Sequence, residues 1–329
     1  MFAICILGLI SGTKTVIGGD VLMVIGGQFF NASSREHETV SSVEIIGENA
    51  VCEIDSLPTP LYGMSAGRVG DRVYVCGGFY YYYRLLCYEY SRTTGRWTVS
   101  RTGLESANAY MASYSAGNQF YLAGGRDYRG GDGSNVEDWL YTSSINKLQN
   151  RRFEKIANLP EPIADGCIVV TNITGKHRLW LIGGSNIPQR YKSEVYSLDL
   201  GAGTWSKQPD MPEQRMWPAC IVTTVEGTLG ILVAGGYFNG GSSIWLPLVD
   251  RNGISLETYE LTLDQPRWEW LSSLTMARKW GSAIGYVNGK LTLAGGGDYG
   301  DNTIEHLIGR DWLKSNLTMK YKREFTAGF

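Results

Sequence analysis

The chain has 329 residues, a net charge of -2, 43% hydrophobic residues and 19% charged residues. This composition contains neither a basic stripe nor an acidic tail, so we expect no nucleic-acid partner and no membrane insertion. The 42 glycines and the 12% aromatic content instead indicate many short strands separated by turns.

The first element is an apolar stretch, residues 2–10, which is too short to cross a bilayer but suits the core of a signal peptide. Ser11 and Gly12 follow it, so we interpret residues 1–12 as a signal peptide and the protein as secreted. The alternative is a buried first strand in a cytoplasmic protein. Sequons at Asn31, Asn172 and Asn316, which we place in loops, would make the secreted chain a glycoprotein.

Six glycine doublets then recur along the chain, each directly after a short apolar strand. Successive doublets begin 47 to 60 residues apart, which is the signature of a repeat architecture. The second glycines of the doublets are Gly27, Gly78, Gly125, Gly184, Gly236 and Gly296.

Three further strands complete each repeat, and we label the four strands A to D. Strand A carries small residues, strand B ends in the doublet, strand C carries a tyrosine and strand D carries a large aromatic residue. The strand C residues are Tyr88 or Tyr90, Tyr141, Tyr196 and Tyr259, and the strand D residues are Trp97, Phe153, Trp205, Trp268 and Trp312.

A four-stranded sheet cannot bury both of its faces alone, so the repeats must stack side by side, and stacking around an axis closes a propeller. The order Gly-Gly, Tyr, Trp resembles the kelch repeat of β-propellers over nearly the whole chain, although Cys52 replaces the first tryptophan and Phe153 the third. We therefore predict an all-β, six-bladed propeller of four-stranded antiparallel blades over residues 13–329. The C-terminal segment REFTAGF matches strand A, so we expect residues 325–329 to close blade 1 beside residues 21–25.

The long connections between B and C, together with the D–A connections, fall on one face of such a propeller, which we call the loop face. The A–B and C–D turns on the other face are short, and function concentrates on loops that a rigid scaffold presents. The D–A connections carry aromatic and charged residues near the axis. The candidate ligand-binding residues there are Tyr62, Tyr110, Asp165, Arg215, Trp217, Arg278, Trp280 and Arg323.

Arginine beside an aromatic residue offers planar donors and a stacking surface. For the three arginines the alternative remains open that they tie neighbouring blades together, as the kelch resemblance implies. The B–C connections add Tyr81 and Tyr82 in a run of four tyrosines, and Asp127 and Asp298 at equal offsets after two doublets.

Cys76 and Cys87 flank the tyrosine run. A hairpin centred between Tyr81 and Tyr82 places them directly opposite each other on strands B and C, at a separation that suits a disulfide. Two independent thiols are the alternative if a bulge at the doublet shifts the register.

Catalytic signals are weak, because the three histidines lie in different repeats and no hydrolase, zinc or phosphate-binding motif is present. We expect no cofactor and no metal, and we interpret the chain as a monomeric, secreted binding module for a protein or glycan. The alternatives are an intracellular kelch adaptor or cytoskeletal binder, and a carbohydrate-active enzyme that resembles the kelch-like mutarotases or oxidases.

Overall fold

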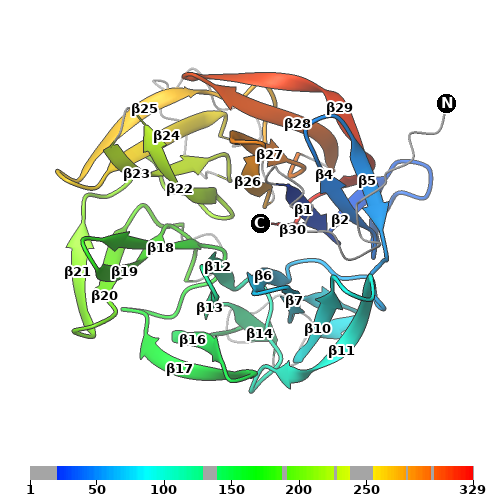
Figure 1. Cartoon of the computed structure of the whole chain (residues 1–329), viewed down its shortest axis with the longest axis horizontal. Coiled ribbons are helices and arrows are strands. Elements are labelled where there is room, and N and C mark those ends of the chain that lie inside the picture. The colour runs from blue at the N-terminus through cyan, green and yellow to red at the C-terminus, as the bar shows by residue number, and fades with distance from the viewer. Residues whose placement is uncertain are drawn as a thin grey trace.

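The computed structural model describes residues 21–128, 139–186, 191–225, 228–237, 255–278, 281–297 and 300–328. These residues form six four-stranded antiparallel sheets and contain no helix. The sheets stand as blades in a ring around a central axis (Figure 1). The prediction of an all-β, six-bladed propeller is therefore confirmed.

Each blade has its strands in the order A, B, C, D, from the axis to the rim. In the first three blades these are β30 (Ala327–Gly328), β1 (Leu22–Ile25), β4 (Val43–Ile46) and β5 (Val51–Ile54); β6 (Ser65–Val69), β7 (Arg72–Cys76), β10 (Leu86–Ser91) and β11 (Arg96–Gly103); and β12 (Ala112–Ala116), β13 (Gln119–Ala123), β16 (Ser144–Gln149) and β17 (Arg152–Asn158). In the last three they are β18 (Cys167–Ile173), β19 (Lys176–Ile182), β20 (Val195–Asp199) and β21 (Thr204–Gln208); β22 (Ala219–Val225), β23 (Thr228–Ala234), β24 (Glu257–Thr262) and β25 (Arg267–Ser273); and β26 (Ala283–Val287), β27 (Lys290–Ala294), β28 (Asp301–Ile308) and β29 (Asp311–Arg323).

Blade 1 joins the two ends of the described chain. Strand β30 pairs with β1, with Gly328 opposite Val24 and Ala327 opposite Ile25. The C-terminus consequently lies near the axis at the centre of Figure 1. The ring is held closed by main-chain hydrogen bonds within one sheet, in addition to side-chain packing between blades.

The glycine doublets anchor each B strand to the D–A connection that leaves the same blade for the next one. In blade 3, Gly124 and Gly125 have φ angles of 64° and 99°, which non-glycine residues rarely adopt. The amide of Gly125 donates to the carbonyl of Ile163, 2.8 Å away, and a Cβ on Gly124 would collide with that same carbonyl. Only glycine therefore allows the connection to approach so closely, and the other five doublets make the equivalent hydrogen bond.

The aromatic residues of strand D lie between blades, as the repeat predicts. The indole nitrogens of Trp97, Trp205 and Trp268 each donate, over 2.9 Å, to a carbonyl at or directly after the end of strand D of the preceding blade. Each ring thus fills the gap between two blades while its polar nitrogen remains hydrogen-bonded. The assignment of Tyr141 to strand C was wrong, because Tyr141 belongs to a separate short ribbon on the loop face.

Three B–C connections form two-stranded ribbons on the loop face. They are β2 (Gln28–Asn31) with β3 (Glu36–Thr39), β8 (Phe79–Tyr80) with β9 (Tyr82–Tyr83), and β14 (Arg126–Tyr128) with β15 (Trp139–Tyr141). In the second ribbon Tyr80 pairs with Tyr82, so the hairpin is centred on Tyr81 and not between Tyr81 and Tyr82 as we expected. Nowhere in the described part of the chain is there a helix long and apolar enough to cross a membrane.

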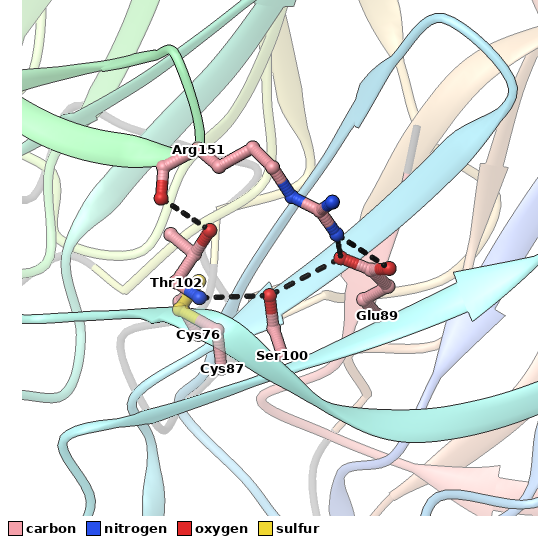
Figure 2. Close-up of a disulfide and its surroundings, with 6 residues drawn as sticks. All are labelled: Cys76, Cys87, Glu89, Ser100, Thr102 and Arg151. Carbon is pink, nitrogen blue, oxygen red and sulfur yellow. Dashed lines mark hydrogen bonds and ion pairs between the residues drawn. A yellow bond between two sulfur atoms is a disulfide. The ribbon is translucent and has the colours of Figure 1, made fainter.

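Two disulfides lie within the described residues. Cys76 on β7 is opposite Cys87 on β10, with Cα atoms 4.1 Å apart, and the two sulfurs are bonded. Figure 2 shows this bridge beside a hydrogen-bonded group, in which Arg151 of blade 3 contacts Glu89 of blade 2 at 3.3 Å. The second disulfide, Cys167–Cys220, joins β18 to β22 and was not predicted.

Candidate functional site

The D–A connections place one residue of unusual backbone conformation beside the axis in each described repeat. Tyr110, Asp165, Trp217 and Phe325 have φ angles of 57°, 61°, 55° and 50°, and Gly63 occupies the equivalent position with 61°. For a non-glycine residue this left-handed conformation costs about 1–2 kcal/mol. The surrounding hydrogen bonds must therefore hold these residues in place.

Those hydrogen bonds run from blade to blade around the axis. The amide of Gly63 donates to the carbonyl of Phe325 at 3.1 Å, and the amide of Tyr110 donates to Gly63 at 2.7 Å. The series continues from Asp165 to Tyr110 at 3.0 Å and from Trp217 to Asp165 at 2.6 Å. Five neighbouring connections are thereby linked through their main chains, and their left-handed residues gather at one end of the axis.

The side chains of these residues pack together. The ring of Phe325 lies 5.1 Å from that of Trp217, 5.7 Å from that of Tyr110 and 6.0 Å from that of Tyr62, measured between centroids. All four rings are half-buried, so each keeps one part in the packed group and another exposed. We call these four residues, with Asp165 and Arg126, the axial cluster.

Arg126 and Asp165 form the charged centre of the axial cluster. The Asp165 carboxylate is buried and accepts hydrogen bonds from the Trp217 indole at 2.7 Å and from the Ser185 hydroxyl at 2.8 Å. The guanidinium of Arg126 lies 3.6 Å from the same carboxylate. It also stacks over Tyr110 at 4.5 Å and over Trp139 at 4.7 Å, so two aromatic faces hold the cation in place.

Burial shifts the protonation equilibria of the axial cluster. It raises the pKa of the Asp165 carboxyl, and the positive charge of Arg126 together with the two hydrogen bonds opposes that rise. Burial also raises the pKa of the Tyr62 and Tyr110 phenols, which therefore stay protonated at neutral pH and can donate hydrogen bonds. The cluster thus offers a ligand aromatic surface, phenol donors and one internally paired charge couple.

The three predicted arginines lie elsewhere, and the expectation that they converge on a ligand at the loop face is not met. Arg215, Arg278 and Arg323 are 0%, 1% and 0% exposed. Each guanidinium donates to a main-chain carbonyl at the end of strand B in the blade it enters and pairs with a buried glutamate. The alternative that such arginines tie neighbouring blades together describes these contacts.

Arg323 illustrates the arrangement. Its NH1 group donates to the carbonyls of Gly26 and Ser42, at 3.0 and 3.1 Å, and its NH2 group pairs with the buried Glu44 carboxylate. Burial lowers the pKa of Arg323, and the charge of Glu44 opposes that change. The guanidinium therefore connects the last D–A connection to two strands of blade 1.

The tyrosine hairpin lies on the same face. Tyr81 and Tyr82 are 79% and 60% exposed, whereas Tyr80 and Tyr83 are half-buried. Tyr81 has a φ of 59°, and the Arg84 guanidinium stacks over Tyr82 at 3.8 Å. The ring centroids of Tyr83 and Trp139 are 6.3 Å apart, and Trp139 in turn contacts Arg126 of the axial cluster. The half-buried end of the hairpin therefore borders the cluster, while its tip faces solvent.

Sequence reasoning missed Arg126 and Trp139, and it placed Asp127 in the site instead. The residue after the doublet was the available signal, because in five of the six repeats it bridges to a D–A connection: Arg126, for example, pairs with Ala109 and Ser185 with Ala164. Asp127 is one residue further along β14, so its side chain points to the opposite face of that ribbon. Trp280 and Asp298 lie outside the described residues.

The three sequons lie in strands, so the prediction that they occupy loops was wrong. Asn31 ends β2, Asn172 is in β18 and Asn316 is in β29, because the A–B hairpin of blade 4 and strand β29 are longer than the repeat suggested. Asn172 and Asn316 are exposed, whereas the half-buried Asn31 amide donates to the Glu38 carboxylate.

A channel of about 1170 Å³ runs along the axis beneath the axial cluster. Its wall is formed by the six innermost strands and is largely apolar, with Ile168, Ile221 and Ile284 among its residues. Tyr110, Trp217 and Phe325 line the end at the loop face, while Asp71 and Asn118 of the short A–B turns line the opposite end. The aromatic rings therefore lie where the channel meets the loop face.

Comparisons with known proteins agree with this architecture. The solved structure titled "Structure of YjhT" superposes with a TM-score of 0.64 and 15% identity over 89% of this chain and 97% of that one, which supports the fold alone. Kelch-like protein 25 of Xenopus tropicalis is 21% identical over 301 residues, or 88% of this chain. The chain spans less than half of that relative, 44% of its length, and no protein-family model matches the sequence.

Six four-stranded blades around a channel define the class of protein as a six-bladed β-propeller. The sequence relative and the repeated Gly-Gly, Tyr and Trp positions support a propeller of the kelch-repeat type. On the loop face of this propeller, the axial cluster gathers four half-buried aromatic rings around the Arg126–Asp165 pair.

Proposed function

We propose that the protein is a secreted binding module that recognises a protein ligand through the axial cluster and the adjoining tyrosine hairpin. The observation that carries this proposal is the gathering of four half-buried aromatic rings around the Arg126–Asp165 pair. Aromatic and arginine side chains dominate the energetics of protein interfaces, particularly near their centres. The exposed Tyr81 and Tyr82 add contact area at the edge of the same face.

Secretion is supported by the apolar stretch at residues 2–10 and by the two disulfides in the described residues. Disulfides persist in oxidising compartments and are rare in the cytosol. Expression of the tagged chain in animal cells tests this part of the proposal. We expect the protein in the medium, with a glycosidase-sensitive mass at Asn172 or Asn316, and retention in the cytosol would contradict it.

Staining of intact animal cells with the tetramerised protein tests recognition. We expect staining that protease treatment of the cells removes, and that Phe325→Ala and Trp217→Phe reduce at least about tenfold, as expected for residues at an interface centre. Leu313→Ala is the matched control, because Leu313 is 53% exposed on β29, the outermost strand of blade 6, where it lies opposite His306. Staining that glycosidase removes and protease does not would identify a glycan instead, and equal staining by all variants would exclude the axial cluster.

A further inference from the structure

The two disulfides differ in how they are placed. Cys76 and Cys87 are 0% exposed and are packed with Tyr74, Met111 and Phe120 in the core between blades 2 and 3. Cys167 and Cys220 are each 8% exposed; they belong to the core between blades 4 and 5 and also line the central channel. The second bridge therefore borders the channel, whereas the first bridge is shielded by packed side chains.

The channel bridge also differs in what it connects. Strands β18 and β22 belong to separate sheets, so Cys167–Cys220 links blades 4 and 5 covalently at the axis. The bridge closes a sequence separation of 53 residues, compared with 11 for Cys76–Cys87, which only reinforces strands that are already paired. Opening the channel bridge removes the covalent constraint between two blades.

The same two connections carry the centre of the axial cluster. Asp165 precedes Cys167 by two residues and Trp217 precedes Cys220 by three. The Trp217 amide donates to the Asp165 carbonyl at 2.6 Å, and the Trp217 indole donates to the Asp165 carboxylate at 2.7 Å. Three links therefore join these segments, and the disulfide is the covalent one.

We propose that Cys167–Cys220 is a thiol-exchange site that a small monothiol reaches through the channel, and that its opening loosens the Asp165–Trp217 pair. A folded protein reductant is too large for a cavity of about 1170 Å³, so the proposed reductant is a small thiol. The bridge lies in the wall of the channel, so its proposed reactivity does not depend on which ligand binds the axial cluster.

The chemistry balances without a metal or cofactor. The thiolate of one monothiol attacks one sulfur of the pair, the Cys167–Cys220 bond breaks, and the other sulfur leaves with the electron pair and takes up a proton. A second monothiol then displaces the protein sulfur from the mixed disulfide. The protein disulfide gains two electrons and two protons, and two monothiols are oxidised to one small disulfide.

Alkylation of the native full-length chain tests access. The protein is incubated with free cysteine, or with a thiol attached to a large polymer, then alkylated with iodoacetamide and digested for mass spectrometry. With free cysteine we expect Cys167 and Cys220 to be labelled at least about tenfold faster than Cys76 and Cys87, whose bridge reacts only in opened molecules. Alkylation of all four cysteines at one rate would overturn the proposal. Equal alkylation of Cys167 after incubation with free cysteine and after incubation with the polymer thiol would overturn it too.

Hydrogen exchange tests the second half of the proposal. In a Cys167→Ser/Cys220→Ser variant, and in protein opened by free cysteine, the amides of Asp165 and Trp217 should exchange at least about tenfold faster than in the intact protein. In the matched Cys76→Ser/Cys87→Ser variant these two amides should keep their original rates. Unchanged exchange in the opened protein, or an equal effect of both double variants, would refute the link to the cluster.

Discussion

Two positions in each D–A connection, only two residues apart, have opposite environments. The first is occupied by Arg215, Arg278 and Arg323 in three connections, and its side chain turns into the blade, where carbonyls and a glutamate surround it. The second is occupied by Trp217 and Phe325, for example, and its left-handed backbone turns the side chain toward the axis. The first position therefore holds the ring together and the second presents a surface.

A substitution at Arg323 tests the role of the first position, and we expect it to cause the largest loss of stability. Arg323→Ala leaves the Glu44 carboxylate buried without its main cation, and breaking a buried ion pair from one side costs about 3–5 kcal/mol. The free energy of unfolding in urea is the measurement. The double variant Arg323→Met/Glu44→Gln should recover part of the loss, and a loss below about 1 kcal/mol for Arg323→Ala would show that the pair contributes little.

Gly124→Ala should have the next largest effect. The added Cβ meets the Ile163 carbonyl at a φ of 64°, so we expect a loss of at least about 2 kcal/mol in urea unfolding. Gly117→Ala is the matched control, because Gly117 has a φ of 58° but no atom near an added Cβ. It should cost only about 1 kcal/mol, which is the price of the backbone conformation alone. Equal losses would mean that close approach does not constrain the doublets.

Trp217→Phe should reduce stability less and affect the surface more. It keeps an aromatic ring but removes the hydrogen bond to the Asp165 carboxylate, which we expect to cost about 1.5–3 kcal/mol because the acceptor is charged and buried. Thermal unfolding measures this loss, and Trp205→Phe, which removes a bond to an uncharged carbonyl, should cost less. A larger loss for Trp205→Phe would contradict the importance of the buried charge.

Tyr81→Gly should have the smallest effect, and in the opposite direction. Tyr81 is exposed and left-handed, so glycine relieves backbone strain while losing little packing, and we expect a gain of up to about 1 kcal/mol. Tyr82→Gly, one residue further in an extended strand, should destabilise the hairpin in the same urea assay. A loss at Tyr81 equal to that at Tyr82 would show that the tip contributes packing that its exposure does not suggest.

The spacing of the doublets was enough to predict the fold, because each doublet has a conformational requirement that only glycine meets. The sequence also indicated which connections approach the axis, and it correctly brought Tyr62, Tyr110, Asp165 and Trp217 to one place. It did not indicate which side chains of a connection turn inward, because that depends on the left-handed residue two positions later. Cys167–Cys220 was not predictable for a related reason: it joins strands of different sheets, whose spacing depends on how the blades pack.

The most direct test of the account compares Arg323 and Phe325, which lie in one connection. Cell staining is measured for Arg323→Met/Glu44→Gln and for Phe325→Ala at a temperature at which both variants are folded. The free energy of unfolding is measured for the same two variants. The account predicts that the first variant is less stable yet stains as the original protein does, while the second loses staining with a smaller loss of stability. Loss of staining in the folded Arg323 variant, with staining kept in Phe325→Ala, would contradict the assignment of recognition to the axial cluster.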